Sequence, residues 1–153
     1  MSVAPVKCSV DVRGPAARAF DLFARNAGAW WPRGKTPAQQ PHVEIVIEPQ
    51  KDGRWFERDS DGNENQWGRV LAWEPPRRLV LGWQLDHHFR FNPGVLTEVE
   101  ISFAELPGGL TRVSLEHRNL ERLGAEADTF AGKIRSGWPE RLADYAKYSS
   151  INT

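Results

Sequence analysis

An apolar stripe near the carboxyl end of the chain places the strongest constraint on its fold. Within residues 121–150, five large apolar residues follow one another at steps of four, four, four and three: Phe130, Ile134, Trp138, Leu142 and Tyr145. This spacing aligns them on one face of an α-helix. A helix of about 25 residues is about 37 Å long at about 1.5 Å per residue. Because its apolar face must be buried, the rest of the chain must supply a second layer.

The predicted helix contains residues that disfavour helical structure. Gly132 and Gly137 each weaken a helix by about 1 kcal/mol relative to alanine. Pro139 has no N–H to donate to the carbonyl of Arg135, so we expect a kink or break near Gly137-Trp138-Pro139, with Pro139 beginning a new segment. A bent helix need not close on a sheet along its whole length. The gap between the two layers is therefore the predicted functional site.

The segments before this helix predict a sheet interrupted by two short helices. Residues 6–12 alternate between apolar and polar, which is typical of a half-buried strand. Short helices are predicted at residues 16–24 and 27–31, and a loop at residues 32–42. Six further strands are predicted at residues 42–47, 54–59, 64–73, 79–85, 97–103 and 111–117. The order indicates an α+β domain, an antiparallel sheet with its helices on one face.

Length, charge and cysteine content narrow the class of protein. A chain of 153 residues predicts one domain, residues 1–153. The 20 basic and 20 acidic residues balance, which argues against nucleic acid as a partner. The single cysteine, Cys8, fits a reducing compartment. The N-terminus does not resemble a secretory signal, and no apolar run reaches the roughly 20 residues of a membrane helix. We expect a cytoplasmic protein that does not insert into membranes.

Seven tryptophans are a large number for a chain of this length. Large aromatic side chains either fill a core or line a concave apolar site, and the sequence leaves both alternatives open. Trp67 is out of phase with its neighbours unless its strand contains a bulge. The residues predicted to line a ligand site between the sheet and the helix are Trp30, Trp31, Trp55, Glu57, Trp67, Trp83, Phe103, His117, Phe130, Ile134 and Trp138.

Glu57 and His117 are the best candidates for chemistry. Strict alternation places Glu57 on the same face as Trp55, which would put a carboxylate among aromatic rings. The alternative is that Phe56 faces inward and Glu57 is solvated. His117 continues an inward-facing alternation and is either a proton-handling group or a hydrogen-bonded structural residue. No nucleophile or oxyanion-binding set accompanies the two residues, so catalysis is not indicated by the residues alone.

Metal and cofactor sites are not predicted. Adjacent residues of an extended chain, such as His87 and His88, point to opposite sides, and no second cluster has metal-ligand spacing. No glycine-rich phosphate loop or nucleotide fingerprint is present.

Several motifs resemble a known family. They are Trp30-Trp31-Pro32, the hairpin running from Gly53 to Gly62, Trp67-Gly68-Arg69-Val70, the segment Trp73 to Leu79, the segment Leu115 to Arg122, and Gly137-Trp138-Pro139. Together they resemble the START-like helix-grip superfamily, also called SRPBCC, in the branch named after activators of the heat-shock chaperone ATPase. That superfamily includes polyketide cyclases and lipid-transfer domains. The resemblance implies a helix-grip fold of six to seven strands wrapped around a long C-terminal helix.

The function implied by this resemblance is the binding of a small hydrophobic or amphipathic molecule between sheet and helix. Two alternatives remain. One is a cyclase-like enzyme that acts on such a ligand by acid–base chemistry, with Glu57 and His117 as the candidate catalytic residues. The other is a module that stimulates a heat-shock chaperone ATPase. The balanced charge gives no electrostatic docking face for a chaperone partner, so this second alternative ranks lower.

Overall fold

The structure is a computed structural model that describes residues 3–32 and 42–151. The strands are β1 (Val6–Arg13), β2 (His42–Ile47), β3 (Arg54–Asp59), β4 (Glu64–Glu74), β5 (Arg78–Trp83), β6 (Thr97–Leu106) and β7 (Leu110–Arg118). The helices are α1 (Ala16–Ala24), α2 (Ala27–Trp30), the 3₁₀ helix η1 (Leu120–Glu126) and α3 (Ala127–Ile151). Most of the loop predicted at residues 32–42 lies outside the described residues.

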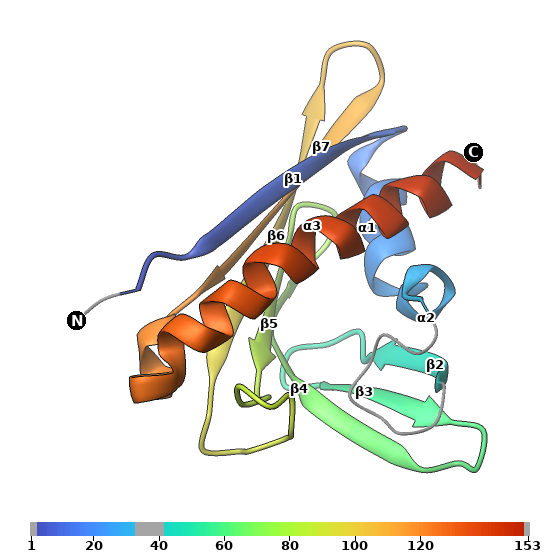
Figure 1. The fold of residues 1–153 in the computed structure, drawn as a ribbon. Coiled ribbons are helices and arrows are strands. Elements are labelled where there is room, and N and C mark those ends of the chain that lie inside the picture. Colours follow the sequence, from blue (N-terminus) through green and yellow to red (C-terminus); the bar gives the residue numbers. More distant parts are fainter. Residues whose placement is uncertain (1–2, 33–41, 152–153) are drawn as a thin grey trace.

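The seven strands form one antiparallel sheet in the order β1-β7-β6-β5-β4-β3-β2. The sheet curves, and α3 crosses its inner face, while α1 and α2 lie toward the carboxyl end of α3 (Figure 1). The predicted α+β helix-grip fold is therefore confirmed, including the strand number and the two short helices after the first strand. None of the described helices is both long enough and apolar enough to cross a membrane.

The predicted break in the last helix is absent, because α3 is continuous through Pro139. Trp138 and Leu142, on either side of Pro139 in sequence, are both buried against the sheet. Their burial supports a helix that its local sequence disfavours, since tertiary packing supplies most helical stability in proteins. The irregular part lies earlier than predicted. Residues 120–126 form a 3₁₀ helix in which Gly124 has a φ of 61°, and α3 begins only at Ala127.

Tyr145, at the end of the stripe, connects α3 to α1 through a hydrogen bond and ring contacts. Its hydroxyl donates a hydrogen bond to the carbonyl oxygen of Ala19 over 2.8 Å, and its ring packs on Phe23 and Trp30. Burial raises the pKa of the Tyr145 phenol, which therefore stays neutral at physiological pH.

A bulge in β4 turns Trp67 toward the interior. In the β3–β4 pairing, Trp55 lies opposite Gly68 and Phe56 lies opposite Gln66, so Trp67 is the extra residue on its strand. This shift is the bulge that the sequence required if Trp67 was to face inward, and the indole is fully buried. The backbone carbonyl of Trp67 then accepts a hydrogen bond from the N–H of Gln84 over 2.8 Å.

The strand predicted at residues 79–85 ends two residues earlier than expected. Trp83 is its last residue, and Leu85 forms an isolated bridge to Phe91 instead of continuing the ladder. The carboxylate of Asp86 accepts hydrogen bonds from the backbone N–H groups of His88 and Arg90, which fold the chain into a tight loop. The apolar alternation in the sequence continues to Leu85, but the hydrogen bonds of Asp86 end the strand earlier. Periodicity alone therefore predicted a strand that is too long.

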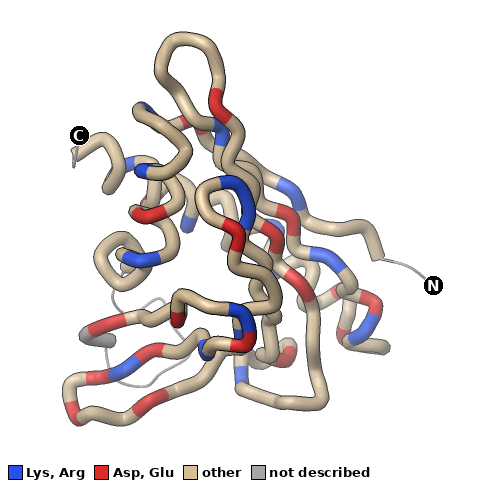
Figure 2. The backbone as a smooth tube through the Cα atoms, turned by 180° about the vertical axis from the view of Figure 1, so that it is seen from behind, with Lys and Arg blue, Asp and Glu red and all other residues tan. Residues whose placement is uncertain are grey.

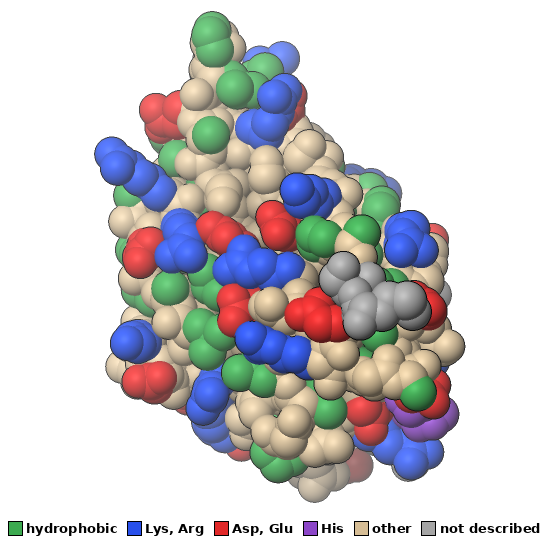
Figure 3. Space-filling view, turned by 90° about the vertical axis from the view of Figure 1, so that its left-hand side faces the viewer, with side chains coloured by type: hydrophobic (Ala, Val, Ile, Leu, Met, Phe, Trp, Pro, Cys, Tyr) green, Lys and Arg blue, Asp and Glu red, His purple; other side chains and the backbone are tan. Residues whose placement is uncertain are grey.

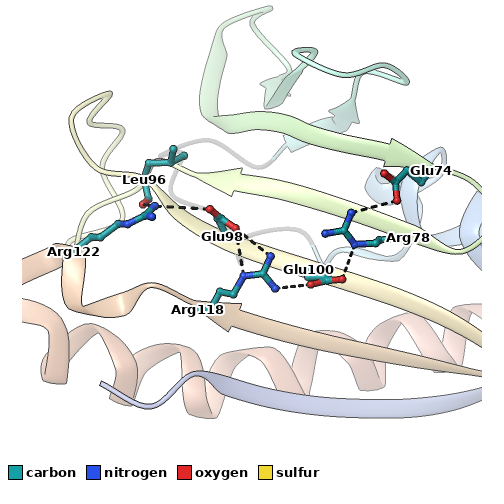
Figure 4. A network of polar contacts seen from close by, with 7 residues as sticks. All are labelled: Glu74, Arg78, Leu96, Glu98, Glu100, Arg118 and Arg122. Atoms are coloured by element: carbon teal, nitrogen blue, oxygen red, sulfur yellow. Dashed lines mark hydrogen bonds and ion pairs between the residues drawn. The ribbon is translucent and has the colours of Figure 1, made fainter. Parts of the chain in front are cut away.

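The outer face of the sheet is covered by ion pairs. Arg78 and Arg118 both bind the carboxylate of Glu100, and Arg118 and Arg122 also contact Glu98 (Figure 4). Hydrogen bonds from Arg118 and Arg78 lower the pKa of Glu100. Basic and acidic positions are interspersed over the back of the molecule (Figure 2), and Figure 3 shows side chains of both signs interleaved on another side. Neither view shows a surface of one sign.

Candidate functional site

Indole rings from four parts of the chain meet between the sheet and α3. Trp55 of β3 lies 5.3 Å from Trp67 of β4, and Trp67 lies 5.0 Å from Trp31, measured between ring centroids. Trp31 follows α2 and packs edge-on against Trp138 of α3 at 6.0 Å. Such tilted and edge-to-face contacts are the favourable geometries for aromatic pairs. The predicted aromatic interior therefore exists.

The indoles fill most of this interior. The enclosed cavity among them measures about 10 Å³, which is close to the space of a single water molecule. Its lining is aromatic and aliphatic and consists of Phe23, Ala27, Trp30, Trp31, Ile47, Trp55, Leu81, Ile101 and Trp138. Around this cavity the described residues pack as a filled core, which is one of the two alternatives that the sequence left open.

A larger groove lies on the surface beside this interior. It has a volume of about 680 Å³ and is lined by α2 with its flanking residues and by Glu44 to Ile47 of β2. Trp30 and Trp31 line both the groove and the enclosed cavity. These two indoles therefore stand between the outside of the molecule and its aromatic interior.

Glu57 points inward, which is one of the two alternatives that the sequence left open. Its side chain is fully buried, and one carboxylate oxygen accepts hydrogen bonds from the indole Nε1 of Trp67 over 2.6 Å and from the Asn65 amide over 3.2 Å. Phe56 lies on the opposite face, where the guanidinium of Arg54 stacks 4.2 Å from its ring centre. The guanidinium of Arg54 thus covers Phe56 on the outer face, while the Glu57 side chain lies within the aromatic interior.

His117 is also buried and is held at both ring nitrogens. Nδ1 accepts a hydrogen bond from the indole Nε1 of Trp138 over 3.0 Å, and Nε2 lies 2.7 Å from the hydroxyl of Thr97. Because an indole N–H can only donate, Nδ1 must be the unprotonated nitrogen, and the proton of the neutral ring is on Nε2. Burial lowers the pKa of His117 to about 3. The ring is therefore neutral at physiological pH.

The geometry agrees with the sequence family that the chain matches. Residues 14–148 match the family described as "Activator of Hsp90 ATPase homolog 1-like protein". The chain belongs to this family. A comparison with curated proteins found no match.

Among solved structures, this family member is similar to the anthrahydroquinone-γ-pyrone synthase Txn09, with 33% identity and a TM-score of 0.66 over 95% of this chain and 97% of the other. It is also similar to CalC of Micromonospora echinospora, a self-sacrificing resistance protein, with 28% identity and a TM-score of 0.71 over 97% and 95%. MLL2253 of Mesorhizobium loti shares the fold at 17% identity, with a TM-score of 0.67 over 98% of each chain.

The predicted site residues of this family member fall into neighbouring groups. Trp83, His117, Phe130 and Trp138 pack together, with Trp83 and His117 5.1 Å apart between ring centroids. A second group joins Glu57 to the indoles Trp30, Trp31, Trp55 and Trp67.

Four of the eleven predicted residues line the cavity of about 10 Å³, namely Trp30, Trp31, Trp55 and Trp138, and the others lie around it. Phe103 lies beneath α1, 5.2 Å from Phe20 and 6.0 Å from Phe23, and does not line the enclosed cavity. Ile134 is buried in the same core but is likewise not part of the cavity lining. The hydrogen bonds of His117 described in the structure run to Thr97 and Trp138, so it does not form a direct pair with Glu57.

The sequence interpretation missed the polar partners of the two buried groups. Thr97 is in phase with the inward residues of its strand, and this alternation was the available signal for its position beside His117. Asn65 precedes the bulge, and no periodicity indicates that it reaches Glu57. The Nε2 of His87 lies 3.6 Å from a carboxylate oxygen of Glu126. Among the described residues, no three His, Cys, Asp or Glu side chains lie close enough together to hold a metal ion.

Proposed function

We propose that this protein binds a flat, mainly apolar small molecule with polar oxygens between the sheet and α3. The carrying observation is the interior set of indoles around a buried carboxylate, Glu57. Stacked and edge-on indoles provide large apolar contact area for fused rings, and a few polar groups fix the orientation of such a ligand. The similarity to a synthase named for an anthrahydroquinone-γ-pyrone supports a polycyclic aromatic ligand class.

Binding requires the indoles to rearrange, because drug-sized ligands occupy about 300–1,000 Å³. Trp31 is the best candidate to move. It is the most exposed of the interior indoles, at 9%, and it follows a helix of only four residues. Its displacement would join the cavity of about 10 Å³ to the surface groove that it also lines. We propose that the ligand takes the place of this ring.

A titration of tryptophan fluorescence tests this proposal. A tricyclic aromatic ketone or phenol is expected to quench the emission, whereas a fatty acid and a sterol serve as comparison ligands of different shape. Trp31→Ala should raise the association rate several-fold, because the closed conformation no longer has to open before the ligand enters. Trp73 packs on Phe20 and is not part of the indole cluster or the cavity lining. The Trp73→Phe variant should therefore bind the ligand as the wild type does. No quenching by any ligand would contradict the proposal.

A cyclase-like reaction is the second candidate function, and the similarity to Txn09 at 33% identity favours it. In this alternative Glu57 transfers a proton to or from the bound polyketide, while His117 positions Trp138. Glu57→Gln keeps an oxygen that can accept from Trp67 but cannot ionise. We expect this variant to lose turnover about 10²- to 10⁴-fold while ligand affinity stays close to that of the wild type. Equal turnover in the two proteins would remove Glu57 from the reaction.

A further inference from the structure

The indole N–H of Trp83 lacks a hydrogen-bond acceptor among the described residues, whereas three other interior indoles each have one. Trp30 donates its Nε1–H to the carbonyl oxygen of Phe23, Trp67 to Glu57 and Trp138 to His117. The Nε1 of Trp83 is buried and has no hydrogen-bond partner among the residues that the structure describes. The two other buried side-chain atoms without a hydrogen bond, on Arg141 and Asp144, form an ion pair with each other.

Among the described residues, the rings that pack around Trp83 leave its N–H without a hydrogen-bond acceptor. Its ring neighbours are Trp55 at 5.6 Å, Trp138 at 5.7 Å, Phe130 at 6.1 Å and His117 at 5.1 Å between centroids. His117 is the polar member of this set, but its Nδ1 already accepts from Trp138, and its Nε2 carries the proton directed at Thr97. Buried donors in native proteins are almost always paired with a protein group or with water, so the unpaired N–H of Trp83 needs a partner from outside the chain.

Trp83 adjoins the part of the interior that the proposed ligand would occupy. Trp55 and Trp138 line the enclosed cavity, and both contact Trp83. On another side, Phe89 packs 6.3 Å from Trp83 and has a φ of 60°, which is unusual for an aromatic residue. Lys133 of α3 holds this loop by donating to the carbonyl oxygen of His87 and by lying 5.4 Å from the Phe89 ring centre.

We infer that Trp83 is a ligand-binding residue whose indole N–H donates a hydrogen bond to a carbonyl or phenolic oxygen of the bound molecule. The inference rests on the proposed ligand-binding function and assigns the recognition of a ligand oxygen to Trp83. A hydrocarbon of the same shape would leave the Trp83 donor unpaired and would bind more weakly. The site therefore selects aromatic ketones and quinones over the corresponding hydrocarbons.

Two probes of one ring frame separate these possibilities. Anthraquinone-2-sulfonate carries two carbonyl oxygens that anthracene-2-sulfonate lacks, and calorimetry gives the dissociation constant of each. The wild type should bind the quinone about five- to tenfold more tightly, the size of one net hydrogen bond. Trp83→Phe should reduce this preference to about one, while Trp73→Phe, which changes an indole outside the interior, should keep it.

A second variant covers the case in which Trp83→Phe does not fold. Replacement of Trp83 by 3-(3-benzothienyl)alanine keeps the bicyclic ring and exchanges only the N–H for sulfur, and it should abolish the same preference. Equal affinity of the wild type for the two probes would overturn the inference but leave the proposed function intact. A preference that persists in the Trp83 variants would assign the hydrogen bond to another donor. Binding of neither probe would contradict both proposals.

Discussion

Gly68→Ala is expected to destabilise the protein by about 3 kcal/mol or more. A methyl group on Gly68 would lie 1.7 Å from the carbonyl oxygen of Gly82 on the neighbouring strand, far inside van der Waals contact. The methyl carbon is bonded directly to the backbone of one strand, and the carbonyl belongs to the backbone of its paired neighbour. Neither group can therefore rotate away. The strands would have to separate beside the bulge that turns Trp67 inward.

Chemical denaturation monitored by circular dichroism measures this loss. Gly132→Ala is the matched control, because a methyl group at that position of α3 meets no atom within 4 Å and alanine favours a helix by about 1 kcal/mol. The control should therefore be slightly more stable than the wild type. A Gly68→Ala protein within about 0.5 kcal/mol of the wild type would show that the two strands are not held as closely as described.

Acidification is expected to unfold the protein more readily than its carboxylates alone require, because of His117. The native pKa of this residue is about 3, below the ordinary 6.5. Between these two values the unfolded chain binds a proton that the native protein does not. Stability is therefore fully present above pH 6.5 and falls by up to about 1.4 kcal/mol for each pH unit below it. At pH 4 the contribution of His117 amounts to a loss of about 3 kcal/mol.

His117→Gln isolates this contribution. The glutamine amide offers one acceptor for Trp138 and one donor for Thr97 but takes up no proton in this range. Unfolding free energies measured at pH 7, 6, 5 and 4 should fall less steeply for the variant than for the wild type. Parallel curves would mean that native and unfolded protein take up a proton at His117 equally readily, and the lowered pKa of the native ring would then be wrong.

The hydrogen bonds of His117 limit what this residue can do in the interior. A neutral histidine whose nitrogens are both engaged is suited to orienting Trp138, and proton transfer would require it to give up one of its hydrogen bonds. Glu57 also accepts hydrogen bonds, from Trp67 and Asn65, so the Glu57→Gln variant is what tests its part in a cyclase-like reaction. A ligand of the proposed size cannot enter the cavity of about 10 Å³ unless an indole moves.

The amino-acid sequence by itself determined the architecture. Alternation in the strands and the spacing of the stripe from Phe130 to Tyr145 predicted the sheet, its helix and the inward direction of His117, whereas the direction of Glu57 stayed open. These features follow from periodicity, which acts over neighbouring residues and can be recognised without knowing the partner layer. The bulge at Trp67 was foreseen only as a condition, because a bulge depends on the strand paired with it.

Only the tertiary structure decided how the interior is filled and which polar atoms are paired. Local sequence disfavours a helix through Pro139, yet burial of Trp138 and Leu142 keeps α3 continuous. Whether six indoles leave a cavity depends on side-chain packing between distant segments. The same holds for the partners of His117 and for the unpaired N–H of Trp83, since contacts between residues far apart in the chain leave no periodic signal in the sequence.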